Sequence, residues 1–389
     1  MPIHESSASP RPVAILIVAY RSPALLDQCL QSVRRHLTGR EVHIWDNSAP
    51  SDEVRGIAGN YPDMRWHFSE ENVGFAAAIN RLAEQVPAHD LLLLNPDAEL
   101  IAPLSATLTA LRQPRVAATA PMVDDPGHCR WDVAHRRMTF LNAIGTSAGF
   151  GERLRGTPLS NLYRRPPDDV DGYLSGACLA ISRSAWDSVG PFDEEFFLYG
   201  EEADWQQRAV AAGWRIRLAG EVGVRHRAMG TVSGDKPVAT RSMDLLRANQ
   251  ALLLERRYGR LSADLFMVWL AMAEMLRRVV YRRRLQPAEG FVITVDGSNA
   301  TVRQRVSLAL RLAASGRPVT VVALDRLGDL PRRLPPPIRL IRAAWWWPSV
   351  TPESLPPVLV RGSSPSRRER AFARLFQLRR AGTRVVSAE

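Results

Sequence analysis

Four consecutive leucines, Leu91 to Leu94, constrain the fold of this 389-residue chain more than any other stretch. A strand with one face in water alternates apolar and polar residues, so this unbroken run predicts a strand buried on both faces of a sheet. Asn95-Pro96-Asp97 follows at once. An acid is therefore expected where a core strand reaches the edge of an open α/β sheet, which is where such sheets bind ligands. A carboxylate there can hold a divalent cation, and the cation can hold a diphosphate.

The segments before this run alternate between strand and helix patterns. Val13 to Ala19 predicts a buried strand, Ala24 to His36 a helix with Ser22 as its N-cap, and Glu41 to Trp45 a second strand. That strand ends in Asp46-Asn47-Ser48. This order, with polar residues at the strand ends, is typical of a nucleotide-binding half of a doubly wound sheet.

Two loops in this half each permit two interpretations. Asp46 can accept a hydrogen bond from the imide N–H of uracil or thymine, but Asp-Asn-Ser is also ordinary turn chemistry. Asn72-Val73-Gly74 leads into a helix expected over Ala76 to Gln85. Gly74 allows close backbone approach and the helix N-terminus offers free N–H groups, while a simple glycine turn is the alternative.

A second acidic group follows an aromatic run. Glu201, Glu202 and Asp204 come directly after Phe196 to Tyr199 and open a helix expected over Asp204 to Ala212. Acids in a first turn complement the helix dipole. Beside an apolar wall, however, one of them can acquire a raised pKa and act as a base.

A histidine closes the next predicted strand. His226 ends the segment that begins at Val222, and it permits two interpretations, an ordinary polar residue or a metal ligand.

Composition narrows the class of protein. Apolar and charged contents of 46% and 23% indicate a folded chain, and its length indicates two domains. Three scattered cysteines supply neither a disulfide framework nor a zinc site, which favours a reducing cytoplasm. The net charge of +11 suits an anionic partner, but the arginines gather after Arg247 without any nucleic-acid module, so nucleic acid is not the expected partner. No secretion signal is visible, and residues 1–11 are expected to be disordered.

Taken together, the motifs resemble the family 2 glycosyltransferases with the GT-A fold, in particular the bacterial rhamnosyltransferase-like branch that builds cell-surface polysaccharides. The resemblance covers about residues 12 to 235, and seven ordered motifs make it specific. The motifs are Val18-Ala19-Tyr20, Trp45-Asp46-Asn47-Ser48, Glu71-Asn72-Val73-Gly74-Phe75-Ala76, Leu94-Asn95-Pro96-Asp97, Ser175-Gly176-Ala177-Cys178, Phe192-Asp193-Glu194-Glu195-Phe196-Phe197-Leu198-Tyr199 and His226.

The resemblance implies roles for individual residues. Asp97 matches the second acid of the family's metal-binding motif, Asn95 stands where many members carry the first acid, and His226 can complete a site for Mg²⁺ or Mn²⁺. Glu202 matches the catalytic base, with Glu201 as second choice. The implied donor-binding residues are Tyr20, Arg21, Asp46, Asn72, Gly74, Asn80 and Asn95.

The resemblance also implies an activity, with departures. The expected reaction is inverting transfer of rhamnose or a similar hexose from a UDP- or dTDP-sugar to a hydroxyl of a glycan or lipid-linked glycan. Arg21 replaces a common asparagine, Glu202 is one methylene longer than the usual aspartate, and only one acid remains in the metal motif. A GT-A-like protein that binds nucleotide sugars or glycans without transfer is therefore the alternative. A nucleotidyltransferase would need a glycine-rich phosphate loop, which Val18 to Ser22 lacks.

The last 150 residues are expected to form two further parts after a GT-A domain over 12–238. Residues 239–288 predict a helical linker, with helices over Met243 to Tyr258 and Ser262 to Leu285. The second is too short and polar to span a bilayer, and it either lies on anionic lipid at the inner face of the membrane or packs between domains. Residues 289–389 predict a small α/β accessory or partial domain. Trp345-Trp346-Trp347 within it is expected to be buried or to form a binding surface.

Overall fold

The structure is a computed structural model that describes residues 11–49, 51–226, 236–280, 290–296, 299–348, 358–361, 365–379 and 382–387. The expected disorder of residues 1–11 therefore lies, except for Arg11, outside the described residues. The chain divides into two compact units with separate hydrophobic cores. The first comprises residues 1–137, 162–194 and 201–231, and the second comprises 138–161, 195–200 and 232–389.

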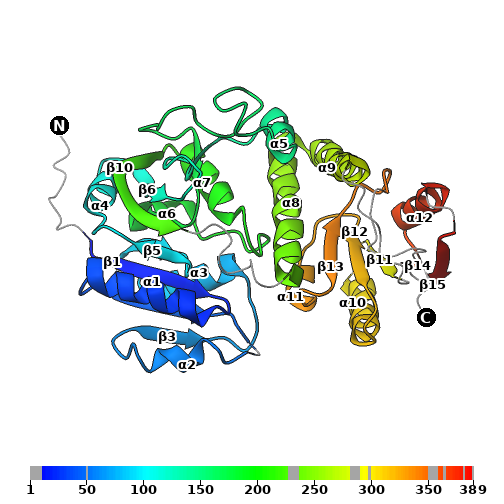
Figure 1. The fold of residues 1–389 in the computed structure, drawn as a ribbon, viewed down its shortest axis with the longest axis horizontal. Helices are drawn as coiled ribbons and strands as arrows, with labels where there is room; N and C mark the ends of the chain where they lie inside the picture. Colours follow the sequence, from blue (N-terminus) through cyan, green and yellow to red (C-terminus); the bar gives the residue numbers. More distant parts are fainter. Residues whose placement is uncertain are drawn as a thin grey trace. The chain divides into compact units, whose positions relative to one another are not determined.

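The first unit is built on a mixed sheet of eight strands (Figure 1). In spatial order these are β3 (Arg65–Phe68), β2 (Glu41–Asp46), β1 (Val13–Ala19), β4 (Asp90–Leu94), β9 (Cys178–Ile181), β6 (Val116–Asp124), β10 (Arg215–His226) and β5 (Ala98–Leu100). The strands from β3 to β4 pair in parallel, whereas β9 runs antiparallel to β4 and β6, and β5 antiparallel to β10. The predicted doubly wound α/β half is confirmed, and the reversed strands complete the sheet of a GT-A fold.

The leucine run forms β4, and every residue of this strand is buried. Leu91 and Leu93 belong to one hydrophobic cluster, and Leu92 and Leu94 belong to another. This division is the two-residue period of a strand that has core on both faces. The prediction from the sequence is confirmed.

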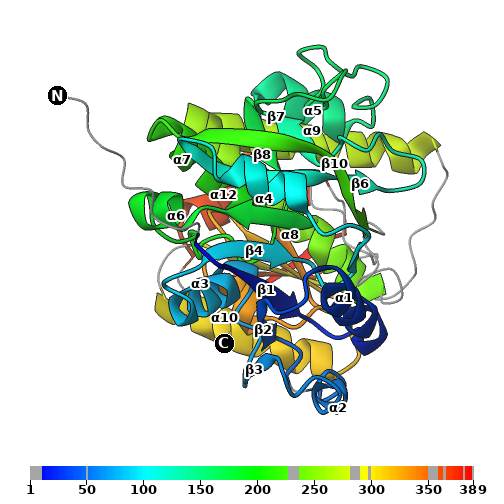
Figure 2. The same cartoon turned by 90° about the vertical axis from the view of Figure 1, so that its left-hand side faces the viewer.

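Helices cover both faces of this sheet. Residues of α3 complete the cluster of Leu91, and residues of α1 complete the cluster of Leu92. Figure 2 shows α1 and α3 on opposite sides of β1. The helices of the unit are α1 (Pro23–His36), α2 (Arg55–Ala58), α3 (Phe75–Gln85), α4 (Ser105–Leu111), α6 (Arg183–Val189) and α7 (Glu201–Ala211).

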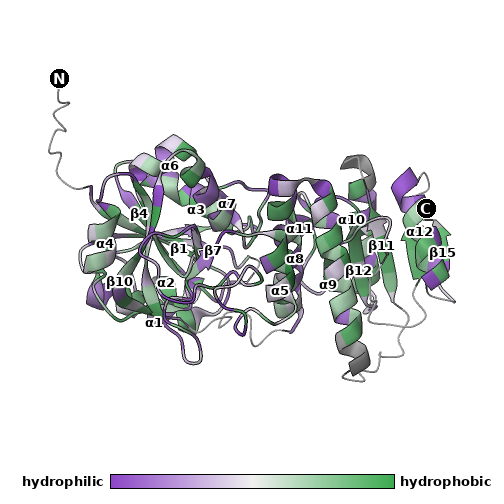
Figure 3. Cartoon of the chain, turned by 90° about the horizontal axis from the view of Figure 1, so that it is seen from above, coloured by the Kyte–Doolittle hydropathy of each residue, from purple (hydrophilic) through white to green (hydrophobic). Residues whose placement is uncertain are grey.

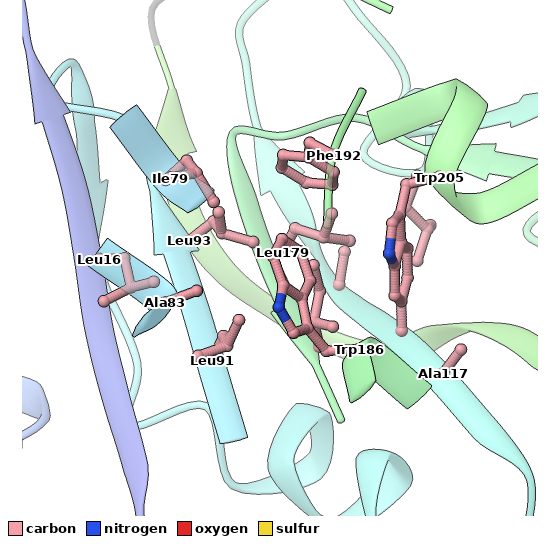
Figure 4. Packing of buried hydrophobic residues seen from close by; sticks show 14 of the residues in the cluster. Leu16, Ile79, Ala83, Leu91, Leu93, Ala117, Leu179, Trp186, Phe192 and Trp205 are labelled. Carbon is pink, nitrogen blue, oxygen red and sulfur yellow. The ribbon is translucent and has the colours of Figure 1, made fainter. Parts of the chain in front are cut away.

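An aromatic group fills the cluster beneath α6 and α7. The ring centres of Trp186 and Trp205 lie 5.8 Å apart, and those of Trp186 and Phe192 lie 5.1 Å apart in a T-shaped arrangement. Figure 4 shows these rings beside Leu93 and Leu179 of the sheet. Such pairs stabilise a core beyond the area they bury.

Several predicted elements differ from those observed. Ser22 precedes α1 but makes no side-chain cap, because it and Arg21 both have left-handed backbone geometry. The helix expected from Asp204 begins at Glu201, which places three acids in its first turn, where the dipole favours them. The strand expected over Val222 to His226 begins at Arg215 in the structure and forms β10, with register shifts between its two halves.

Two more corrections concern segments between the motifs. The three-residue strand β5 was not predicted. The segment after Asp124 contains a short strand and a helix that were also not predicted, β7 (Ala134–Arg136) and α5 (Phe140–Ser147), and β7 pairs with β8 (Gly172–Leu174) in a separate two-stranded sheet. A capping box at Thr139 and Asn142 starts α5.

The second unit contains a five-stranded, fully parallel sheet. Its order is β13 (Arg339–Arg342), β12 (Val319–Ala323), β11 (Phe291–Val295), β14 (Val358–Arg361) and β15 (Arg384–Ser387). Numbered within this unit the order is 3-2-1-4-5, which is the order of the first five strands of a doubly wound sheet. Its helices are α5, α8 (Lys236–Tyr258), α9 (Arg260–Val280), α10 (Asn299–Ala314), α11 (Leu330–Arg333) and α12 (Arg367–Arg379), and Figure 3 shows their hydropathy.

The predicted helices of this unit are present with shifted ends. α8 starts seven residues before Met243, and the last part of the helix expected to reach Leu285 lies outside the described residues. Trp345, Trp346 and Trp347 are each half-buried, and their use as a binding surface stays a prediction. None of the described helices is long and apolar enough to cross a bilayer.

Candidate active site

The end of β4 and the end of β10 meet at one corner of the first unit. A turn closed by the Ala98 amide donating to the Asn95 carbonyl (3.1 Å) leads from β4 into β5. The antiparallel pairing of β5 with β10 then places His226 opposite Ala98. As a result, Nε2 of His226 lies 3.3 Å from Oδ1 of Asp97. The sheet thus brings together the two residues that the sequence proposed as metal ligands.

The donor set of this pair suits Mg²⁺ or Mn²⁺, because it offers a carboxylate oxygen and an imidazole nitrogen. The Asp97 and His226 side chains are 5% and 18% exposed. Within the described ranges, no group of three or more His, Cys, Asp or Glu residues is arranged to hold a metal ion. A cation held by Asp97 and His226 would therefore need oxygens from outside this set, such as those of a diphosphate or water.

Backbone contacts fix Asn95 beside this corner. Its amide donates to the Ala177 carbonyl (3.0 Å), in the Ser175-Gly176-Ala177-Cys178 motif. Its carbonyl accepts from Sγ of Cys29 at 3.6 Å. Burial, and then the charge of Asp97, raises the pKa of the Cys29 thiol, so Cys29 remains protonated.

The loops after β1 and β2 hold each other in place. The amide of Ser48 donates to Oδ1 of Asp46 at 2.9 Å, and the amide of Arg21 donates to Oγ of Ser48 at 2.7 Å. Asp46 is buried, and the Arg21 guanidinium lies 5.4 Å from the centre of the Tyr20 ring. The turn interpretation of Asp46 is therefore correct for Oδ1, and base recognition by Asp46 stays a prediction.

Asn47 links this loop to the next one, and the sequence reasoning missed it. Its Oδ1 accepts from the amide of Val73 (3.2 Å) and from Nε1 of Trp45 (3.0 Å), and its Nδ2 donates to the Gly74 carbonyl (3.1 Å). Asn72 accepts from the amide of Gly74, whose φ of +87° favours glycine. An asparagine directly after a predicted strand was the available signal, although it does not identify the partners.

Asn80 lies in α3 and serves the neighbouring loop. Its Nδ2 donates to the Phe192 carbonyl (2.9 Å) and to Glu194 (3.3 Å), while its Oδ1 accepts from the amide of Phe192. The amide thus holds the loop between α6 and α7. Direct contact of Asn80 with a donor sugar remains a prediction.

The acid pair at the start of α7 is asymmetric. Glu201 is 4% exposed and its Oε2 has no hydrogen-bond partner, whereas Glu202 is half-buried. Burial raises the pKa of Glu201 well above its ordinary value, and the charge of Glu202 raises it further. Both effects favour the protonated form of Glu201, so Glu202 is the member of the pair better suited to accept a proton.

Helix α7 is clamped so that this pair has a defined position. Gln206, fully buried, accepts from the amide of Leu174 and donates to its carbonyl, both at 2.8 Å. Trp205 donates to the Gly190 carbonyl at 2.8 Å. Gln206 was also missed, although a glutamine on the apolar side of a helix is the signal of such a clamp.

An aromatic pair completes the surroundings of Glu202. Tyr173 faces His135 across the β7–β8 pairing, with ring centres 4.8 Å apart. Burial, and then the charge of Glu202, raises the pKa of Tyr173, and burial lowers the pKa of His135 to about 4. Both rings are thus neutral at neutral pH. Gly172 allows this pairing, since a Cβ there would lie 2.0 Å from the His135 carbonyl oxygen.

The mixed sheet, with a carboxylate–histidine pair at one strand end and two interlocked polar loops at others, is the arrangement expected from the glycosyltransferase motifs. The family model described as "Glycosyltransferase like family 2" matches residues 10–242. The chain belongs to this family, and the resemblance found in its motifs is confirmed.

Comparison with individual proteins agrees with the family. An N-acetylglucosaminyl-diphospho-decaprenol L-rhamnosyltransferase, present in two strains of Mycobacterium tuberculosis, is 31% identical over 219 residues, which cover 51% of this chain and 71% of that protein. The chain is thus a glycosyltransferase with a rhamnosyltransferase relative.

Two solved structures also match. A mannosyltransferase from Pyrobaculum calidifontis in complex with GDP-Man and Mn²⁺ is 14% identical, with 80% of this chain and 81% of that chain covered and a TM-score of 0.44. S. aureus TarS 1–349 in complex with UDP-GlcNAc is 13% identical, with 69% and 73% covered and a TM-score of 0.41. Because both TM-scores are below 0.5, the assignment rests on the family and on the sheet.

Proposed function

We propose that the chain is an inverting glycosyltransferase of cell-surface polysaccharide synthesis. It moves rhamnose or a similar hexose from a UDP- or dTDP-sugar to a hydroxyl of a glycan or lipid-linked glycan. The observation that carries this proposal is the 31% identity with a rhamnosyltransferase over 219 residues. The Asp97–His226 pair and the acid pair of α7 supply the chemistry.

The acid pair of α7 acts on the acceptor. Glu202 takes the proton of the acceptor hydroxyl as its oxygen bonds to the anomeric carbon, and the bond from that carbon to the diphosphate breaks. Attack opposite the leaving group inverts the configuration. Glu201 stays protonated, so only one negative charge faces the acceptor.

The loops at the strand ends of the sheet bind the donor. Asp46 accepts from the imide of the pyrimidine, with Tyr20 and Arg21 beside the base, and Asn72, Gly74, Asn80 and Asn95 line the rest of the donor. Asp97 and His226 would hold Mg²⁺ or Mn²⁺, which neutralises charge on the diphosphate when it is bound. The transfer reaction takes place in the cytoplasm, at the inner face of the membrane where lipid-linked acceptors are found.

Two measurements test this function. Thermal-shift titrations with UDP- and dTDP-sugars, with and without Mn²⁺, identify the donor, and mass spectrometry of a GlcNAc-diphospho-polyprenol acceptor detects transfer. The Asp97→Ala variant is expected to lose metal-dependent transfer. Transfer that remained metal-dependent in this variant would refute the metal assignment, and donor binding without transfer to any glycan acceptor would favour the non-catalytic alternative.

A further inference from the structure

Helix α9 of the second unit has apolar residues on both its inner and its outer face. Its inner face packs Ala263, Phe266, Met267 and Leu270, all buried, at the spacing of one helical side. This inner face explains how α9 packs in the unit, but it does not explain why the opposite side of the helix is also apolar.

The opposite side is exposed and consists of large apolar residues. With about 100° per residue, Leu261, Leu265, Val268, Met272, Met275 and Leu276 fall within an arc of about 100°. Five of them are 42% to 66% exposed, and Val268 is half-buried. We call these six residues the outer face of α9.

The few polar residues of this stretch avoid the outer face. Asp264 is buried and accepts from Nε1 of Trp346 at 3.3 Å, and Glu274 falls on the inner half of the helix by its spacing. A helix on the surface of a protein in water normally places its polar residues outward and its apolar residues inward. Figure 3 shows the apolar colouring along α9. An exposed apolar stripe of this kind marks an interaction surface.

Charge indicates which partner covers this face. The sequence continues with Arg277, Arg278, Arg282, Arg283 and Arg284, and the next acid is Glu289. Parallel pairing with a second copy would set these five arginines against the same five. An anionic bilayer surface complements both features, since it takes leucine and methionine side chains at the acyl boundary and arginines at the headgroups.

We propose that the outer face of α9 docks the enzyme on the anionic surface of a lipid bilayer, with the helix lying in the interface. The proposal rests on the proposed function for its purpose, which is to bring the enzyme to a lipid-linked acceptor. The binding itself needs neither donor nor transfer, so the two can fail separately.

The test is co-sedimentation of the full chain with vesicles of phosphatidylcholine alone or mixed with phosphatidylglycerol. We expect binding to the mixed vesicles that weakens with salt. The Leu261→Gln, Met272→Gln and Leu276→Gln triple variant should bind at least about tenfold more weakly. Changing Arg282, Arg283 and Arg284 to Gln should weaken binding by about fivefold per arginine.

The matched control is the Leu310→Gln, Leu378→Gln double variant, because these leucines are exposed elsewhere in the same unit. It should bind like the wild type, and circular dichroism should be unchanged for all variants. Absence of vesicle binding, or equal loss in the control, overturns the proposal. A wild-type dimer that the triple variant converts to a monomer, without vesicle binding, assigns the face to a second copy instead. Vesicle binding without any donor response in thermal-shift assays would refute the proposed transferase function but would still support the proposed lipid-binding surface.

Discussion

Replacing Glu201 by glutamine tests the protonation of the acid pair directly. Glu201 is buried at the first position of α7, and its burial and the adjacent Glu202 raise its pKa. A neutral carboxylic acid and a carboxamide have nearly the same size and shape, and each has a carbonyl oxygen that accepts and at least one hydrogen that it can donate. Glu201→Gln should therefore preserve the packing of α7 and remove only the titration.

The expected difference in unfolding free energy between the wild type and Glu201→Gln follows from proton linkage. In the unfolded chain a glutamate titrates near pH 4.3, while folded Glu201 holds its proton to a much higher pH. The raised pKa therefore gives stability that is fully present below the unfolded pKa and is lost as the pH rises towards the folded one. Across that window, wild-type stability should fall relative to the variant by about 1.4 kcal/mol per pH unit.

Urea unfolding of both proteins at pH 5, 6, 7 and 8 measures this difference. The exposed Glu53→Gln variant is the matched control, and its stability should run parallel to the wild type. If the curves for Glu201→Gln and the wild type were also parallel, Glu201 would be ionised in the folded protein. The assignment of Glu202 as the only charged member of the pair would then be wrong.

Four further substitutions have separate readouts. Glu202→Gln removes the proposed base and should lower kcat by about 10²–10⁴-fold without changing the thermal shift caused by the donor; near-normal kcat would exclude it as the base. Asp97→Asn should lose the Mn²⁺-dependent part of the donor thermal shift, and an unchanged shift would place the metal elsewhere. Asn47→Ala leaves the Val73 amide unpaired and should cost about 1–3 kcal/mol in urea unfolding along with donor affinity; unchanged values would refute its linking role. Trp205→Ala should cost about 3–5 kcal/mol, because it empties the aromatic cluster, and a loss below 1 kcal/mol would mean that the cluster repacks.

The parts of the fold that local pattern determines could be predicted from the sequence. The run Leu91 to Leu94 has core on both faces, as expected of unbroken apolar residues. The family followed from ordered motifs, because strand ends and loops keep their spacing within one unit. Asp97 and His226 were named from the resemblance, and their 3.3 Å approach agrees with it.

What the sequence did not reveal depends on contacts between distant residues. Asn47 and Gln206 bind backbone groups 26 to 32 positions away, and no local pattern identifies such partners. Ser22 had the chemistry of a cap, but the Arg21 amide bonds to Ser48 and turns the backbone out of the capping geometry. β5 is too short to show a period, and it exists only because β10 offers a partner.

The pairing of β5 with β10 also has a kinetic consequence. Asp97 and His226 are separated by 128 intervening positions, so the chain must close a very long loop before they can meet. Closing a loop of this length costs entropy before the contact is gained, so contacts of such high sequence separation slow folding. In a refolding experiment we therefore expect metal affinity to develop after most of the secondary structure. The appearance of metal binding would then report the last step in the assembly of the catalytic unit.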